Sequence, residues 1–171
     1  FLAQELSPDE LALPVWAFCQ GVPAFEGADP KALDRAARQV GLDAGLFWDD
    51  RPMSTLSGGE RVKLRLALPL LDEPDVLLLD EPSNDLDVAT LGWLEGFLLG
   101  CKVPVLYISH DEPLLEHTAN MIIHLERLRR RTAPRCTVAR TGYVQYVEQR
   151  AAGFARQEQN ARKERAEFDA K

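Results

Sequence analysis

Two pairs of polar residues each follow an apolar run, and their types suggest chemistry. Asp80 and Glu81 follow the run "VLLL", while Ser109 and His110 follow "VPVLYI". Two adjacent carboxylates at the end of a buried strand are costly unless something positive lies beside them. Mg²⁺ with a nucleotide phosphate would supply that charge. Alternatively, the two acids cap the next turn and His110 is a hydrogen-bonded turn residue.

A second candidate site is the segment "LSGGE" at 56–60. Ser57 and Glu60 fit the capping box of a helix start, yet Gly58 and Gly59 each cost about 1 kcal/mol inside a helix. A helix N-terminus binds anions through its free N–H groups, and glycine lets a phosphate come close to the backbone. The segment therefore favours a phosphate-binding helix start. It is not a P-loop, because no lysine in the chain follows glycine and precedes Ser or Thr.

The elements around these residues are expected to alternate between helix and strand. We expect a helix after Asp29 that stops at Gly41, a helix after Ser57, and a polar helix from about Tyr143. Between the last two we expect a strand "DVLLLDEP" buried on both faces, a helix near 88–99, a strand "VPVLYIS", a short helix near 112–119, a strand "MIIHLE" and a further strand "CTVAR". "FLAQE" is expected to end a strand. This order predicts an α/β fold, a mostly parallel sheet with flanking helices, and function at the carboxyl ends of its strands.

Length and composition set the limits. The 171 residues are 46% hydrophobic and 27% charged, which are ordinary globular values, and the chain begins without methionine, as a piece of a longer protein would. No apolar run approaches the roughly 18 residues that span a bilayer, so no membrane insertion is expected. Cys19, Cys101 and Cys136 have no metal-ligand spacing and fit a reducing, cytoplasmic setting.

The charge is unevenly distributed. Residues 127–171 hold 12 Lys or Arg against 5 Asp or Glu, a balance of +7, and the remaining residues carry −14 within a total of −7. A basic segment on an acidic body is typical of contact with nucleic acid. The densest charges are Arg129, Arg130 and Arg131. The alternative for these three residues is a solvated helix end.

Taken together, these motifs resemble those of an ABC-type ATPase domain. "LSGGE" (56–60) resembles the signature motif, "VLLLDEP" (76–82) the Walker B strand, "SNDLD" (83–87) the D-loop and "SHD" (109–111) the switch histidine. Gln4 stands where the family has its Q-loop glutamine. The Walker A loop of the family has no counterpart in the chain, so the chain alone is expected to be inactive.

The resemblance is strongest to the ABC-F branch, which consists of ribosome-associated, twin-ATPase proteins that are not transporters. "DEPSNDLD" is similar to the ABC-F form "DEPTNHLD", with Asp85 in place of His, and "TGYVQYVEQR" to the segment that enters the interdomain linker, without the usual Asn after Gly142. The implied organisation is a Q-loop strand end at 1–6, a helical subdomain at 7–55, an ATPase core at 56–142 and the start of the linker helix at 143–171.

The family resemblance also implies roles for single residues. Asp80 would hold Mg²⁺ through water, Glu81 would orient or deprotonate the attacking water, His110 would contact the γ-phosphate, Gln4 would sense Mg²⁺ and water, and Asp87 would link the two sites of a dimer. Ser57, Gly58, Gly59 and Glu60 would serve an ATP molecule held by a second, head-to-tail ATPase domain of the same protein.

The implied function is ATP hydrolysis on the ribosome, with contacts to rRNA or tRNA, by a translation factor or an antibiotic-resistance protein. Arg129, Arg130 and Arg131 would contact RNA. Two other classes stay open: an ATP-binding subunit of an ABC transporter coupled to a membrane permease, and a DNA-repair ATPase, since some of those carry "LSGGE".

Overall fold

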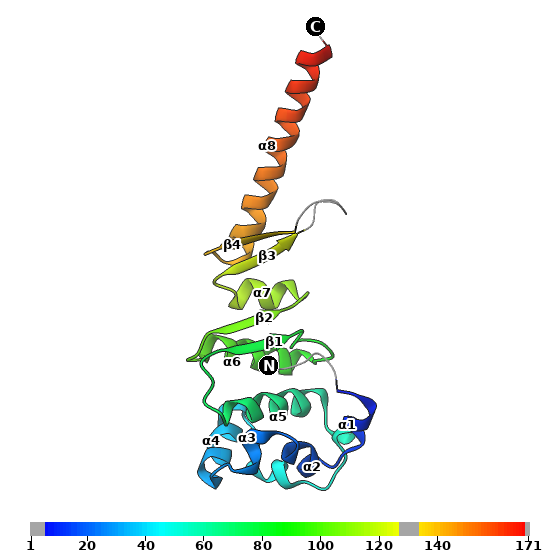
Figure 1. Ribbon diagram of the computed structural model, residues 1–171, viewed down its shortest axis with the longest axis vertical. Helices are drawn as coiled ribbons and strands as arrows, with labels where there is room; N and C mark the ends of the chain where they lie inside the picture. The colour runs from blue at the N-terminus through cyan, green and yellow to red at the C-terminus, as the bar shows by residue number, and fades with distance from the viewer. Residues whose placement is uncertain (1–5, 127–133, 170–171) are drawn as a thin grey trace. The chain divides into compact units, whose positions relative to one another are not determined.

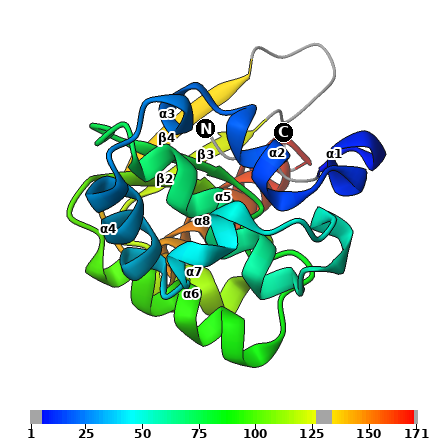
Figure 2. The ribbon, with the colours of Figure 1, turned by 90° about the horizontal axis from the view of Figure 1, so that it is seen from below.

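The computed structural model describes residues 6–126 and 134–169. Within it the chain divides into two compact units, residues 1–111 and 112–171, and each is described by itself (Figures 1 and 2). The expected strand end in "FLAQE" lies outside the described residues.

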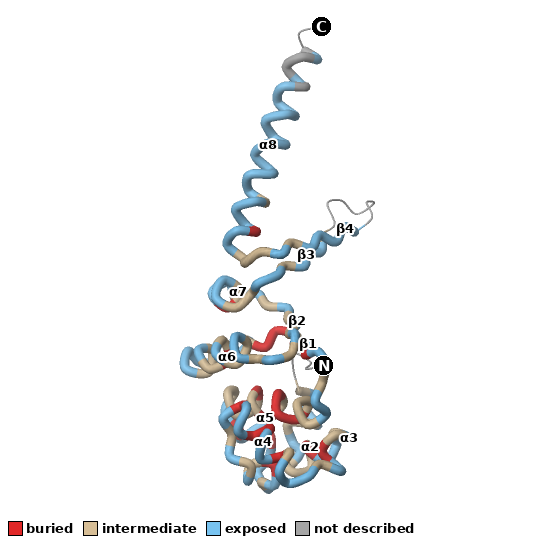
Figure 3. Tube along the Cα trace, turned by 90° about the vertical axis from the view of Figure 1, so that its left-hand side faces the viewer, coloured by how far each residue is buried: buried red, intermediate tan, exposed pale blue. Residues whose placement is uncertain are grey.

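The first unit begins with helices and continues into a short parallel sheet. Its elements are α1 (Pro8–Ala12), α2 (Val15–Gln20), α3 (Pro23–Glu26), α4 (Pro30–Val40), the 3-10 helices η1 (Ala44–Trp48) and η2 (Met53–Thr55), α5 (Gly58–Leu70), β1 (Leu77–Asp80), α6 (Val88–Gly100) and β2 (Val105–Ile108). The side chains of Val15, Val40, Phe47, Met53 and Leu64 are fully buried and form the core of its helical part. Figure 3 shows these buried stretches on α2, α4 and α5.

Helix α4 has the two ends that its sequence predicts. The Asp29 carboxylate accepts a hydrogen bond from the Lys31 N–H at 2.9 Å, and Pro30 takes the first helical position, where it loses no hydrogen bond. Gly41 ends the helix with φ of 68° in the left-handed region, which glycine adopts without a steric penalty. The predicted start and stop are confirmed.

Strands β1 and β2 are parallel, with Leu77 opposite Val105 and Asp80 opposite Ile108. The prediction that β1 is buried on both faces is wrong. Leu77 and Leu79 are buried, whereas Leu78 is 39% exposed. Successive side chains point to opposite faces of a strand, and among the described residues only one face of this strand is covered.

The second unit contains α7 (Glu112–Thr118), β3 (Ile122–Glu126), β4 (Arg135–Ala139) and α8 (Tyr143–Asp169). β3 and β4 are antiparallel, with Ile122 opposite Ala139 and Glu126 opposite Arg135. The α/β class is confirmed. Among the strands that the structure describes, β1 and β2 pair in parallel as expected, whereas β3 and β4 do not. The connection from β3 to β4 is shorter than the dozen or more residues that a parallel crossover needs, so it can only return as a hairpin.

Helix α8 is anchored at its start and exposed beyond it. Tyr146 is buried, and Arg150 Nη1 lies 2.9 Å from Glu126 Oε2 of β3. After that turn the described residues are exposed (Figure 3), and the expected Glu158–Arg162 pair forms at 2.7 Å. In the described part of the chain, no helix combines the length and the apolar character needed to span a membrane.

Candidate functional site

Glu81 and His110 lie together just past the ends of β1 and β2. Glu81 Oε1 is 3.4 Å from His110 Nε2, and Glu81 Oε2 accepts a hydrogen bond from the His110 backbone N–H at 3.2 Å. Only 8% of the Glu81 side chain is exposed, whereas that of His110 is 97% exposed. A buried carboxylate thus lies beside an imidazole that is open to solvent.

The parallel register explains this meeting. Asp80 pairs with Ile108, and the Glu81 N–H continues the ladder by donating to the Ile108 carbonyl at 2.9 Å. Glu81 then leaves the strand with φ of 46°, a left-handed conformation that costs a non-glycine residue about 1–2 kcal/mol. Glu73 and Asp85 share this conformation, so it is a property of the turns in this unit and marks no residue as catalytic by itself.

Asp80 ends β1 next to Glu81 and is half-buried. Carboxylate oxygens are the ligands that Mg²⁺ prefers, so Asp80 suits an ion that is also bound by phosphate and water. Within residues 6–126 and 134–169, no three His, Cys, Asp or Glu side chains converge as a ready-made metal cage. The metal role of Asp80 stays a prediction.

The segment between β1 and α6 is tied to both strand ends and to the helix. Ser83 Oγ lies 3.0 Å from Ser109 Oγ, which also accepts a hydrogen bond from the Asp111 N–H at 3.0 Å. Asp87 is the N-cap of α6, and its Oδ1 accepts from the Thr90 N–H at 2.7 Å. Hydrogen bonds from the Thr90 backbone and hydroxyl hold the pKa of Asp87 below its usual range.

Residues 57–60, which we call the signature turn, start α5 with the predicted capping box. The Glu60 N–H donates to Ser57 Oγ at 3.2 Å, while Glu60 Oε2 accepts from the Ser57 N–H and hydroxyl, both at 2.9 Å. These hydrogen bonds lower the pKa of Glu60. The sequence prediction of a capped helix start is confirmed.

The two glycines of the signature turn lie against the D-loop and α6. A Cβ atom on Gly58 would lie 2.8 Å from the carbonyl oxygen of Asp85, and one on Gly59 would lie 2.5 Å from Thr90 Oγ1. Real Cβ atoms do not approach other heavy atoms this closely. Both glycines are therefore required by packing within the chain, and their predicted service to a phosphate stays a prediction.

The structure thus brings together Glu81 with His110, and the signature turn with Asp85 and Thr90. Gln4, Arg129, Arg130 and Arg131 lie outside the described residues. Sequence reasoning misses Thr90, since no motif contains it. The signal was the glycine pair itself, because glycine also marks a close approach by a neighbouring segment.

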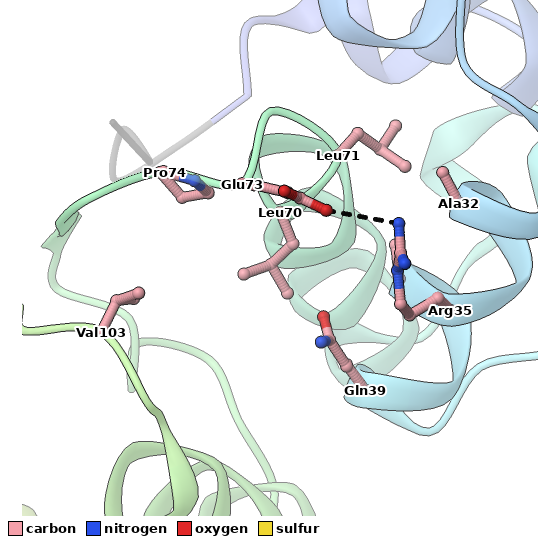
Figure 4. A pocket seen from close by; sticks show the side chains of 9 residues that line it. Ala32, Arg35, Gln39, Leu70, Leu71, Glu73, Pro74 and Val103 are labelled. Atoms are coloured by element: carbon pink, nitrogen blue, oxygen red, sulfur yellow. Dashed lines mark hydrogen bonds and ion pairs between the residues drawn. The ribbon is translucent and has the colours of Figure 1, made fainter.

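A separate pocket of about 270 Å³ lies beside α4 and the turn after α5 (Figure 4). It is lined by Ala32, Arg35, Ala36, Gln39, Leu70, Leu71, Glu73, Pro74 and Val103. Arg35 Nη2 and Glu73 Oε1 form an exposed ion pair across it at 3.4 Å. No predicted site residue lines this pocket, so it is no part of the candidate site.

Known proteins share these motifs. A family model described as ABC transporter matches residues 3–84. The tylosin resistance ATP-binding protein TlrC of Streptomyces fradiae is 37% identical over 98% of this chain and 30% of its own length. Elongation factor 3 of Gonapodya prolifera is 46% identical over 67% of this chain and 10% of its own length.

A solved structure agrees on the fold. The cbiO1 protein of Clostridium perfringens, part of the ABC transporter complex cbiONQ, superposes with a TM-score of 0.52 at 22% identity, covering 66% of this chain and 47% of its own. This chain spans less than a third of the length of the curated relatives that it matches. The relatives include ABC-F proteins, so this chain resembles part of an ABC-type ATPase domain, of the kind found in the ABC-F family.

Proposed function

We propose that the intact protein is an ABC-F ATPase that hydrolyses ATP with Mg²⁺ in the cytoplasm and acts on the ribosome. The observation that carries the ATPase assignment is the buried Glu81 carboxylate beside the exposed His110 at the carboxyl ends of two parallel strands. The ribosomal assignment is supported by relatives named for translation elongation and for tylosin resistance.

Each side chain of the strand ends has a proposed role. Asp80 would hold Mg²⁺ through water, and the metal would supply positive charge that neutralises phosphate. Glu81 orients the attacking water and accepts its proton, and its hydrogen bond from the His110 N–H keeps the acceptor in place. His110 contacts the γ-phosphate, which its exposure permits, and Gln4 senses the metal and the water. Such catalysis rests on positioning and charge neutralisation.

The signature turn serves a nucleotide held by a second ATPase domain, head to tail. The first N–H groups of α5, those of Gly58 and Gly59, offer donors to a γ-phosphate. Asp87 caps α6 and is hydrogen-bonded to Thr90, which contacts Gly59. From this position Asp87 links the two nucleotide sites of the paired domains. The proposed boundaries remain 7–55 for the helical subdomain, 56–142 for the core and 143–171 for the linker start.

The 171-residue chain by itself is expected not to bind ATP tightly or to hydrolyse it. The family holds the β- and γ-phosphates with the N–H groups and lysine of a Walker A loop, and the chain has no such motif. Titration calorimetry with Mg-ATP should show no micromolar binding. A micromolar dissociation constant would contradict this proposal.

The ribosomal assignment is tested with the intact Glu81→Gln protein. Loss of the proton acceptor should trap the ATP-bound form, which should co-sediment with ribosomes in ATP and less so in ADP. Glu95→Gln, at a half-buried position on α6, is the matched control and should show no trapping. Association with membrane vesicles in place of ribosomes would favour the transporter subunit instead.

A further inference from the structure

We infer that Thr90 is a positioning residue for the signature turn: its side chain fills the space that a side chain at position 59 would need, and so fixes where α5 begins. The inference rests on the proposed function only for its catalytic consequence. Its structural part depends on contacts within residues 57–90.

Gly59 lies against the side chain of Thr90. A Cβ atom on Gly59 would meet three atoms of one residue, Thr90 Oγ1 at 2.5 Å, Cγ2 at 3.1 Å and Cβ at 3.4 Å. Gly58 differs, because its Cβ atom would meet the backbone oxygen of Asp85 at 2.8 Å. Only the conflict at Gly59 can be relieved by changing a side chain.

The Thr90 side chain cannot rotate away from Gly59. Its backbone N–H and its hydroxyl are both hydrogen-bonded to Asp87, the N-cap of α6. The Cβ atom of threonine carries two heavy atoms, Oγ1 and Cγ2, which occupy two of the three staggered positions around χ1. In Thr90 both of these atoms face Gly59. Every other rotamer therefore still directs at least one of them at position 59.

The contact between Gly59 and Thr90 sets the position of the signature turn. The signature turn is already capped by Ser57 and Glu60, so its internal geometry is fixed. The contact with Thr90 adds the position of that turn relative to α6, and through Asp87 relative to the D-loop. If the Gly59 N–H meets a phosphate of another domain, Thr90 determines where that donor lies.

A mutant cycle in the full chain tests the structural part. Gly59→Ala should lower the urea midpoint of unfolding and speed exchange of the Glu60 and Arg61 amides by roughly tenfold. In a Thr90→Ala background the same substitution should raise the midpoint, because alanine is a better helix former than glycine and its methyl group now meets only ordinary contacts. The effect of Gly59→Ala thus reverses sign.

Two controls distinguish the specific contact between Thr90 and position 59 from a general destabilisation of the fold by Thr90→Ala. Thr90→Val keeps both branches, so Gly59→Ala should remain destabilising beside it. Gly58→Ala should stay destabilising in the Thr90→Ala background, since its conflict is with the Asp85 backbone. If Gly59→Ala changed the midpoint by the same amount in the parent and in the Thr90→Ala background, the inference would be overturned.

The catalytic consequence is measured in the intact protein. Gly59→Ala should lower kcat for ATP hydrolysis, and adding Thr90→Ala should recover most of the loss, whereas adding Thr90→Val should recover none. Failure of this recovery, with the stability cycle as expected, would overturn the positioning role. Absence of ATPase activity in the parent would instead contradict the proposed function and leave the stability cycle to decide the structural part.

Discussion

The signature turn and helix α8 both belong to helix-forming segments, yet they are stabilised in opposite ways. At the signature turn, the capping box satisfies polar groups and a neighbouring segment approaches so closely that two glycines are needed. Beyond Arg150, the described part of α8 lies exposed and is supported by local pairs such as Glu158 with Arg162. The signature turn is stabilised by contacts with segments distant in sequence, whereas this part of α8 depends on helix propensity and on side-chain pairs within the helix.

The largest expected effect is on turnover and involves neither region. Glu81→Gln in the intact protein should reduce ATP turnover by about 10²–10⁴-fold, because the amide cannot accept the proton of the attacking water. ATP binding should persist. Steady-state hydrolysis and nucleotide binding measured on the same preparation give both values, and turnover at the parental rate would refute the role of Glu81.

The contrast between the two regions should show directly in stability. Leu64 of α5 is fully buried, so Leu64→Ala should cost about 2–5 kcal/mol of unfolding free energy. Phe168 of α8 is 82% exposed, and Phe168→Ala should change that free energy by less than about 0.5 kcal/mol. Urea unfolding of the chain measures both. Equal losses of unfolding free energy in the two variants would contradict the contrast between α5 and α8.

A smaller effect is expected from the capping box, and it depends on pH. Ser57→Ala should cost about 1 kcal/mol near pH 7. The pKa of Glu60 in the folded state lies below its unfolded value, so this stabilisation is present above about pH 4.3 and is lost as the pH falls through the folded-state pKa. The difference in unfolding free energy between the parent and Ser57→Ala, measured by urea unfolding, should therefore become smaller towards pH 3. Glu60→Gln should show a flatter pH dependence than the parent, and a gap that widens in acid would contradict the argument.

The smallest effect is expected from the basic segment. Replacing Arg129, Arg130 and Arg131 by alanine in the intact protein should leave ribosome-free ATPase activity nearly unchanged. Each lost phosphate contact should reduce the slope of log affinity against log salt by about 0.7–0.9. Ribosome co-sedimentation across a salt series measures both the affinity and this slope. An unchanged affinity and an unchanged slope would contradict RNA contact by the three arginines.

How far the sequence predicts this molecule depends on how local the cause is. The ends of α4 and the capping box at Ser57 follow from neighbouring residues, and both are predicted from the sequence. The pairing of Glu81 with His110 follows from two strands that end at one sheet edge, so the sequence predicts that the two lie near each other. The contacts of Gly58 with Asp85 and Gly59 with Thr90 join segments that are separate in sequence, and no local pattern contains them. The antiparallel pairing of β4 with β3 is not predicted. The alternation of helices and strands favours a parallel sheet, although the short connection between these two strands favours a hairpin.

The most direct test of the account is a structure of the intact Glu81→Gln protein with Mg-ATP, determined on the ribosome. In that structure Ser57 Oγ and the Gly59 N–H should lie about 3 Å from the γ-phosphate of a nucleotide held by the second ATPase domain. Glu81 would lie next to the other nucleotide, held by its own domain. A signature turn that faces solvent in this closed state, with no nucleotide within reach, would contradict the central claim.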